Sequence, residues 1–205
     1  VVLTGSKNIT FANATSALAL GASRTLVNNL SGDAVLEVAG AGIINTAAST
    51  LTISGPGNAV FSGPYAAGTG ASVLTMAGSG QLTLTAAANA YTGATNVNRG
   101  NFLLNGSGAI TATSGITVSQ GATFTLNNAA TNVANRVNDA ATVALSGATM
   151  NFVGNASGST ETLAALTVGS GQTTINSTTS GGNNALTFAS LTTNTGGFTN
   201  FTGTN

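Results

Sequence analysis

The heptapeptide LTMAGSG at residues 74–80 decides the fold, because its pattern recurs along the chain. LEVAGAG at residues 36–42 and LTISGPG at residues 51–57 share its order of apolar, variable, apolar, small, Gly, variable and Gly positions. Looser copies follow at residues 116–121, 143–147 and 166–171. Alternating apolar residues are typical of a β-strand with one buried face, and the glycine that follows permits a bend.

The spacing of these units predicts a solenoid. Units begin at residues 36, 51, 74, 97, 116, 143, 166 and 186, so each is too short for a propeller blade of about 40 residues. Counting one further coil around residues 17–20, we predict an all-β parallel β-solenoid of about nine irregular coils, each of roughly 20–27 residues. The predicted interior positions are Leu36, Val38, Leu51, Ile53, Leu74, Met76, Leu82, Leu84, Ile116, Val118, Val143, Leu145, Leu166 and Val168.

The composition excludes several classes of protein. Ala, Thr, Gly, Asn and Ser fill 141 of the 205 positions, which disfavours a helical domain because helices need longer straight-chain residues. Hydrophobic residues make up 42% of the chain, which argues against disorder. The net charge is zero, which predicts neither nucleic acid nor an anionic membrane as a partner. No apolar run approaches the roughly 20 residues of a membrane-spanning helix, so we expect no membrane insertion of this segment.

The inventory of reactive side chains is small. The chain has no Cys and no His, and its four acids are Asp33, Glu37, Asp139 and Glu161. We expect Asp33 and Glu37 to be a solvated pair, and Asp139 to form an ion pair with Arg136 three residues earlier. A glycosidase needs converging carboxylates, and zinc or nucleophilic sites need His or Cys. The sequence therefore predicts no catalytic, cofactor-binding or metal site, and we expect that the protein is not an enzyme.

Two polar segments interrupt the repeat, at residues 127–139 and 154–162. We expect both to be loops that protrude from the coils. We interpret these segments first as solvated connections between coils that tolerate insertions. The alternative is that one of them is a binding loop.

The stretch GQLTLT at residues 80–85, followed by AYTGATNVNRG at residues 90–100, resembles the autotransporter-associated β-strand repeat. The likeness extends over about residues 72–205, although Ala94 stands where the family usually has Gly, and Asn101 and Phe102 where it usually has Thr and Leu. The resemblance implies a right-handed parallel β-helix in the passenger region of a bacterial surface protein, exported and displayed outside the cell. It also implies a stalk or adhesive role.

Two functional hypotheses follow. The first is a structural coil array, a single solenoid over residues 1–205 that starts at Val1 rather than Met and is expected to belong to a longer repetitive chain. Its terminal rungs, with apolar residues at 1–3 and 198–201, would associate with flanking coils of the same chain or with another copy. The alternative is an adhesin or carbohydrate-binding module that contacts a surface glycan through exposed Asn, Thr and Tyr91 side chains or through residues 127–139.

Overall fold

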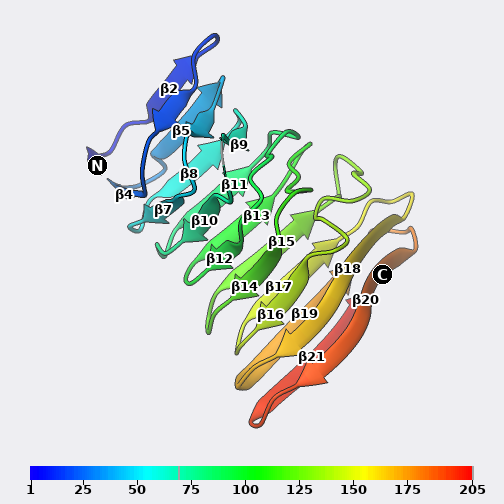
Figure 1. The fold of residues 1–205 in the computed structure, drawn as a ribbon. Helices are drawn as coiled ribbons and strands as arrows, with labels where there is room; N and C mark the ends of the chain where they lie inside the picture. Colours follow the sequence, from blue (N-terminus) through cyan, green and yellow to red (C-terminus); the bar gives the residue numbers. More distant parts are fainter. Residues whose placement is uncertain (69, 205) are drawn as a thin grey trace.

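The alternating segments of the sequence form strands that stack coil upon coil. The computed structural model describes residues 1–68 and 70–204, and every regular element within them is a β-strand. Every pairing between these strands is parallel. Figure 1 shows the coils following one another from the N-terminal end to the C-terminal end. The prediction of an all-β parallel β-solenoid is confirmed.

Two nine-stranded sheets form the long faces of the solenoid. Sheet A consists, in spatial order, of β1 (Val2–Gly5), β4 (Arg24–Leu30), β7 (Thr50–Ser54), β10 (Val73–Met76), β12 (Thr95–Val97), β14 (Gly115–Val118), β16 (Thr142–Leu145), β18 (Ser159–Val168) and β20 (Asn184–Thr193). Sheet B consists of β2 (Ile9–Asn13), β5 (Val35–Gly40), β8 (Asn58–Phe61), β11 (Gln81–Leu84), β13 (Asn101–Leu104), β15 (Thr123–Asn127), β17 (Thr149–Val153), β19 (Gly171–Thr178) and β21 (Gly197–Thr204).

A third, shorter sheet closes the first three coils. Sheet C consists of β3 (Leu18–Leu20), β6 (Ile43–Asn45) and β9 (Tyr65–Ala67). Beyond β9, where sheet C ends, hydrogen bonds from a buried side chain link successive coils on the same side of the solenoid. Asn89 accepts a hydrogen bond from the backbone N–H of Tyr65 at 2.8 Å and donates one to the carbonyl of Ala109 at 3.0 Å.

The register between coils corrects the predicted unit starts. Leu36 lies on sheet B whereas Leu51 lies on sheet A, so the interval between them is part of one coil. Val97 pairs with Met76 rather than Leu74, and Leu186 pairs with Glu161. The aligned residues of sheet A are separated by 27, 23, 21, 21, 27, 23 and 25 residues, and they are Arg24, Leu51, Leu74, Thr95, Ile116, Val143, Leu166 and Leu191.

The interior is a continuous apolar core shared by both long sheets. All fourteen predicted interior residues are buried, with exposed fractions of 2% or less. Aligned residues stack from coil to coil, as the rings of Phe102 and Phe124 do with their centroids 5.8 Å apart. Burial of such side chains contributes about 1.5–3 kcal/mol each relative to exposure, so the core is the main source of stability.

A glycine at a corner shows how closely the coils approach. Gly42 has a φ of +71°, and a Cβ atom added there would overlap the backbone of Pro64 in the next coil. Both the left-handed backbone and the close approach therefore require glycine.

Candidate functional site

The four carboxylates do not form one cluster: Asp33 and Glu37 lie in an early coil, whereas Asp139 and Glu161, whose charges interact, lie further along the rod. Asp33 is exposed in the turn before β5, and Glu37 lies on the outer side of β5, where it accepts a hydrogen bond from the Ser62 hydroxyl at 2.8 Å. Asp139 and Glu161 belong to later coils. Across residues 1–68 and 70–204, no group of three His, Cys, Asp or Glu side chains is placed to hold a metal ion. The expectation that the protein is not an enzyme stays a prediction.

Arg136 is the largest fully buried side chain in the described part of the chain. Its Nε donates to Oδ1 of Asn128, and Nη1 donates to the carbonyl of Gly108 at 2.5 Å. Its Nη2 donates to the carbonyls of Gly106, Asn127 and Thr131 at 2.8, 2.7 and 2.9 Å. The guanidinium group therefore holds the turn after β13 against the segment after β15, because one planar group satisfies carbonyls from both.

Glu161, on β18, holds the same segment from the next coil. Its Oε2 accepts the backbone N–H of Arg136 at 2.9 Å, and its Oε1 accepts that of Val137 at 3.1 Å. Burial raises the pKa of Glu161 to about 7, against the lowering effect of these two hydrogen bonds, and the charge of Asp139 raises it further. Burial lowers the pKa of Arg136 to about 10. Both oxygens of Glu161 are occupied by backbone donors, so this carboxylate positions a segment and is not presented to a substrate.

Residues 128–139 and 154–158 lie outside the named strands, as expected of loops, but two parts of that prediction are wrong. Residues 127–139 are not a simple solvated loop, because Asn127 ends β15 and Asn128, Arg136 and Val137 are buried. Asp139 is exposed, and the hydrogen bonds of the Arg136 side chain go to Asn128 and to carbonyl groups instead. Residues 159–162 of the second expected loop belong to β18. The polar composition misled the prediction because a buried arginine needs polar neighbours as its partners.

Tyr91 is also wrongly predicted, since it is fully buried rather than available to a ligand. Its ring lies 5.0 Å from that of Tyr65, and its hydroxyl shares a hydrogen bond of 2.6 Å with the Thr95 hydroxyl. Tyr65 itself accepts a hydrogen bond from the Asn45 amide at 2.5 Å and donates one to the carbonyl of Val73 at 3.2 Å. Burial raises the pKa of both phenols. The pair is a hydrogen-bonded part of the core.

The outer side of sheet B carries an open groove that the sequence did not indicate. The groove has a volume of about 560 Å³ and crosses five successive strands from β8 to β17. We call it the amide groove, and its lining comprises Pro56, Asn58, Ser79, Gly80, Gln81, Gly100, Asn101, Gly121, Thr123, Thr125 and Asn151. Every one of these residues is uncharged, and four of them carry side-chain amides: Asn58, Gln81 and Asn101 in successive coils, and Asn151 two coils further on. The alignment of Asn58, Gln81 and Asn101 can be recognised in the sequence only once the coil length is known.

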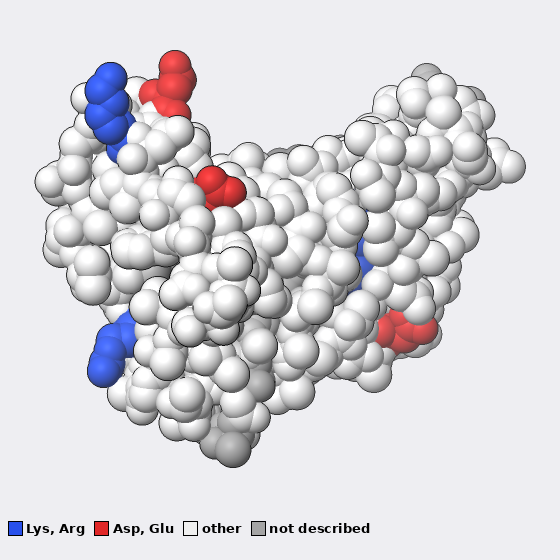
Figure 2. All heavy atoms as spheres, turned by 90° about the horizontal axis from the view of Figure 1, so that it is seen from above, with Lys and Arg blue, Asp and Glu red and all other residues white. Residues whose placement is uncertain are grey.

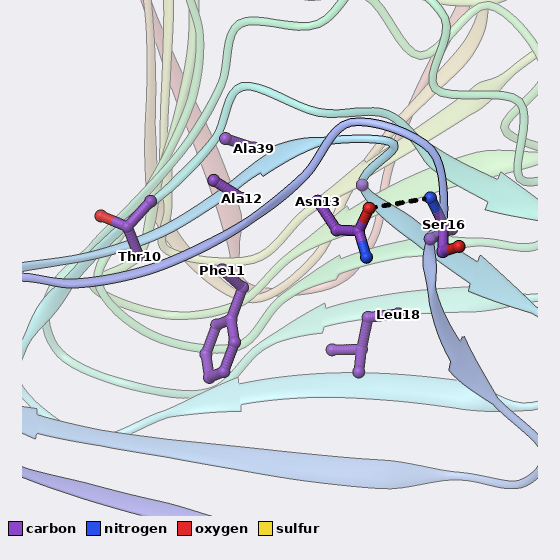
Figure 3. A pocket seen from close by; sticks show the side chains of 9 residues that line it. Thr10, Phe11, Ala12, Asn13, Ser16, Leu18 and Ala39 are labelled. Carbon is purple, nitrogen blue, oxygen red and sulfur yellow. Dashed lines mark hydrogen bonds between the residues drawn. The ribbon is translucent and has the colours of Figure 1, made fainter.

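Both end coils leave inward-facing apolar residues uncovered. Phe201 is 57% exposed and Leu191 is 53% exposed, although their register partners in the preceding coil, Ile175 and Leu166, are buried. At the other end, Phe11 is 41% exposed, and its side chain and that of Leu18 point into a hollow of about 410 Å³ (Figure 3). Within residues 1–68 and 70–204, each end strand pairs with one neighbour: β1 and β20 are the end strands of sheet A, and β2 and β21 are those of sheet B.

The surface carries few charges. Figure 2 shows one face as a largely uncharged expanse with isolated basic and acidic side chains. Of the four basic residues, Arg136 is buried and Lys7, Arg24 and Arg99 are exposed. Among the described residues there is no helix that could cross a membrane.

Comparison with known families finds a match over part of the chain. Residues 74–104, which run from β10 to the end of β13, match the family model of the passenger-associated-transport-repeat. No curated protein and no solved structure matches the chain. The matched segment contains the residues 80–85 and 90–100 on which the resemblance to the autotransporter-associated repeat depends. Residues 74–104 are thus similar to the passenger-associated-transport-repeat, and this match and the parallel β-solenoid fit the resemblance to the autotransporter-associated repeat.

Proposed function

We propose that this chain is a structural segment of a secreted or surface-displayed passenger, in which stacked coils form a stalk or fibre. The repeat match and the β-solenoid support a passenger-like domain. Passenger-type repeats belong to exported surface proteins, and the solenoid supplies a rod on which coils can stack.

The observation that carries the structural role is the exposure of interior columns at the ends of the rod. Phe201 continues the column of Phe124, Met150 and Ile175, and Leu191 continues the column of Val143 and Leu166. An exposed strand edge offers unpaired backbone groups, and a further parallel coil would satisfy these groups and bury the apolar residues at the same time. We infer that the end coils stack on other coils of the same kind.

A charge placed in the exposed column tests this role. In the 205-residue protein, sedimentation velocity and negative-stain imaging should show concentration-dependent end-to-end association. Phe201→Lys should shift the protein to shorter species, because it places a charge in the contact. Thr117→Lys, on an exposed position in the middle of β14, is the matched control and should leave the association unchanged. A protein that stays monomeric at high concentration contradicts the proposal.

A second candidate function is adhesion, and one observation favours it: the amide groove is an open, uncharged and hydrogen-bonding surface on an outer face of the rod. This role does not require Tyr91 or the segment at 127–139. It is compatible with a stalk, since the groove and the end coils are different surfaces.

A further inference from the structure

We propose that the amide groove binds an extended, uncharged β-1,4-linked hexose polymer that runs across the coils. This inference rests on the second of the proposed functions, adhesion, and specifies its site and its ligand class. The argument uses the spacing, the hydrogen-bonding state and the charge of the groove residues.

The groove repeats a polar side chain at the spacing of the coils. Gln81, Asn101 and Thr123 are aligned with one another in the register of β11, β13 and β15. Asn58 occupies the equivalent place one coil earlier, where its Oδ1 accepts the backbone N–H of Gln81 at 2.9 Å. Adjacent strands lie about 4.8 Å apart. One β-1,4-linked hexose advances by nearly the same distance, so each sugar of an extended chain would meet one polar side chain.

The amides of the groove are held in place by one another. Asn101 Nδ2 donates to Oε1 of Gln81 at 2.7 Å, and Gln81 Nε2 donates to the Thr83 hydroxyl at 3.0 Å. Such a network fixes side chains before a ligand arrives, which lowers the entropic cost of binding.

One acceptor in this network is unsatisfied. Oδ1 of Asn101 is buried and has no hydrogen-bond partner among residues 1–68 and 70–204. Because Nδ2 of Asn101 donates its hydrogen bond to Gln81, Oδ1 on the other side of the same amide is directed away from Gln81. Buried polar atoms without a partner are uncommon, because leaving one unpaired loses the hydrogen bond that it makes with water in the unfolded chain. A sugar hydroxyl is a donor of the kind this oxygen lacks, and a small movement of the amide would bring the two together.

The absence of charge in the groove selects a neutral ligand. No lining residue is ionisable, and Arg99, which precedes Gly100, is the one basic residue adjacent in sequence to the lining. A single cation does not match the repeated negative charge of a uronic acid polymer. The lining also contains no aromatic ring on which a sugar could stack. Binding therefore depends on hydrogen bonds to several sugars at once, and affinity should increase steeply with the length of the oligosaccharide.

Calorimetric titration of the 205-residue protein with cellohexaose, cellobiose and an oligogalacturonate of six residues tests this inference. Cellohexaose should bind, cellobiose should bind at least about tenfold more weakly, and the oligogalacturonate should not bind. Gln81→Ala and Thr123→Val should each weaken cellohexaose binding about tenfold or more. Thr123→Val keeps the shape of the side chain, so it tests the contact even if Gln81→Ala disturbs the fold.

Two variants serve as matched controls. Asn96→Ala removes an amide from the outer side of β12 in sheet A, outside the groove lining, and Arg99→Gln removes the nearby charge. Both should bind cellohexaose as the parent protein does. The inference is overturned if cellohexaose does not bind, if binding is unchanged in Gln81→Ala and Thr123→Val, or if binding requires Arg99 and favours the anionic oligomer. End-to-end association of the same variants, measured by sedimentation, reports separately on the structural role.

Discussion

The carboxylate of Glu161 is bound to the backbone of Arg136, and not to its guanidinium group, although both side chains are buried. The guanidinium group is directed instead to carbonyls of the preceding coil and of its own segment. Two charged residues thus hold the segment between β15 and β16 from opposite sides. This arrangement makes both residues structural.

Replacing Arg136 should destabilise the protein strongly. Arg136→Leu would leave the carbonyls of Gly106 and Gly108 without their donor and would leave Glu161 buried without a nearby positive charge. We expect a loss of about 3–5 kcal/mol in the free energy of unfolding, measured by urea denaturation. Arg99→Leu, at an exposed arginine, is the control and should change this free energy by less than about 0.5 kcal/mol. Equal effects of the two substitutions would contradict the assignment.

Glu161 should make stability depend on pH. Its pKa is raised by burial from 4.5 to about 7 in the folded protein, so the folded state binds this proton more tightly than the unfolded state does. The contribution of Glu161 to the free energy of unfolding is therefore fully present below about pH 4.5 and is lost as the pH rises through 7. Denaturation at several pH values should show stability falling across this interval. In Glu161→Gln the fall should be smaller, and an identical profile in both proteins would refute the prediction.

The core should tolerate truncation poorly. Leu126, on β15, is fully buried between Leu104 and Phe152 in the register of sheet B. Leu126→Ala should lower the free energy of unfolding by about 2–5 kcal/mol, because the removed atoms leave a cavity among the neighbouring coils. Thr117→Ala, on an exposed position of β14, should change it by less than about 0.5 kcal/mol. Comparable losses at both positions would show that inward and outward faces are assigned incorrectly.

Glycine substitution should separate backbone strain from crowding between coils. Gly32 and Gly42 have similar φ angles of +65° and +71°, but a Cβ atom at Gly32 would meet no atom within 4 Å. Gly32→Ala should therefore cost only the left-handed conformation, about 1–2 kcal/mol. Gly42→Ala should cost clearly more, because the added atom overlaps Pro64. Thermal unfolding followed by circular dichroism would compare them, and equal costs would argue against close packing at this corner.

The apolar positions could be predicted from the sequence because burial in a strand imposes a period of two. Leu82 and Leu84 illustrate this pattern, since both point inward from β11 as expected. The register was harder to predict. The motif of Leu36 and the motif of Leu51 look alike, yet they lie on different sheets, because both long faces have the same requirement for alternating apolar residues.

The buried polar residues could not be predicted by pattern alone. Arg136 stands in an Asn-rich stretch that resembles a solvated loop, and its partners are backbone carbonyls that leave no trace in the sequence. The amide groove presents the same difficulty. Gln81 and Asn101 are 20 residues apart, and only the coil length brings them side by side.

The register between successive coils has a consequence for how such a chain changes in length. Each strand in the two long sheets pairs only with the coil before it and the coil after it, at a separation of 21–27 residues in sheet A. Duplication of one coil would lengthen the rod by about 4.8 Å and would leave every other pairing as it was. Deletion of one coil would shorten it by the same step. Gene duplication can therefore change the length of the rod one coil at a time, while the interior contacts of the other coils stay as they are.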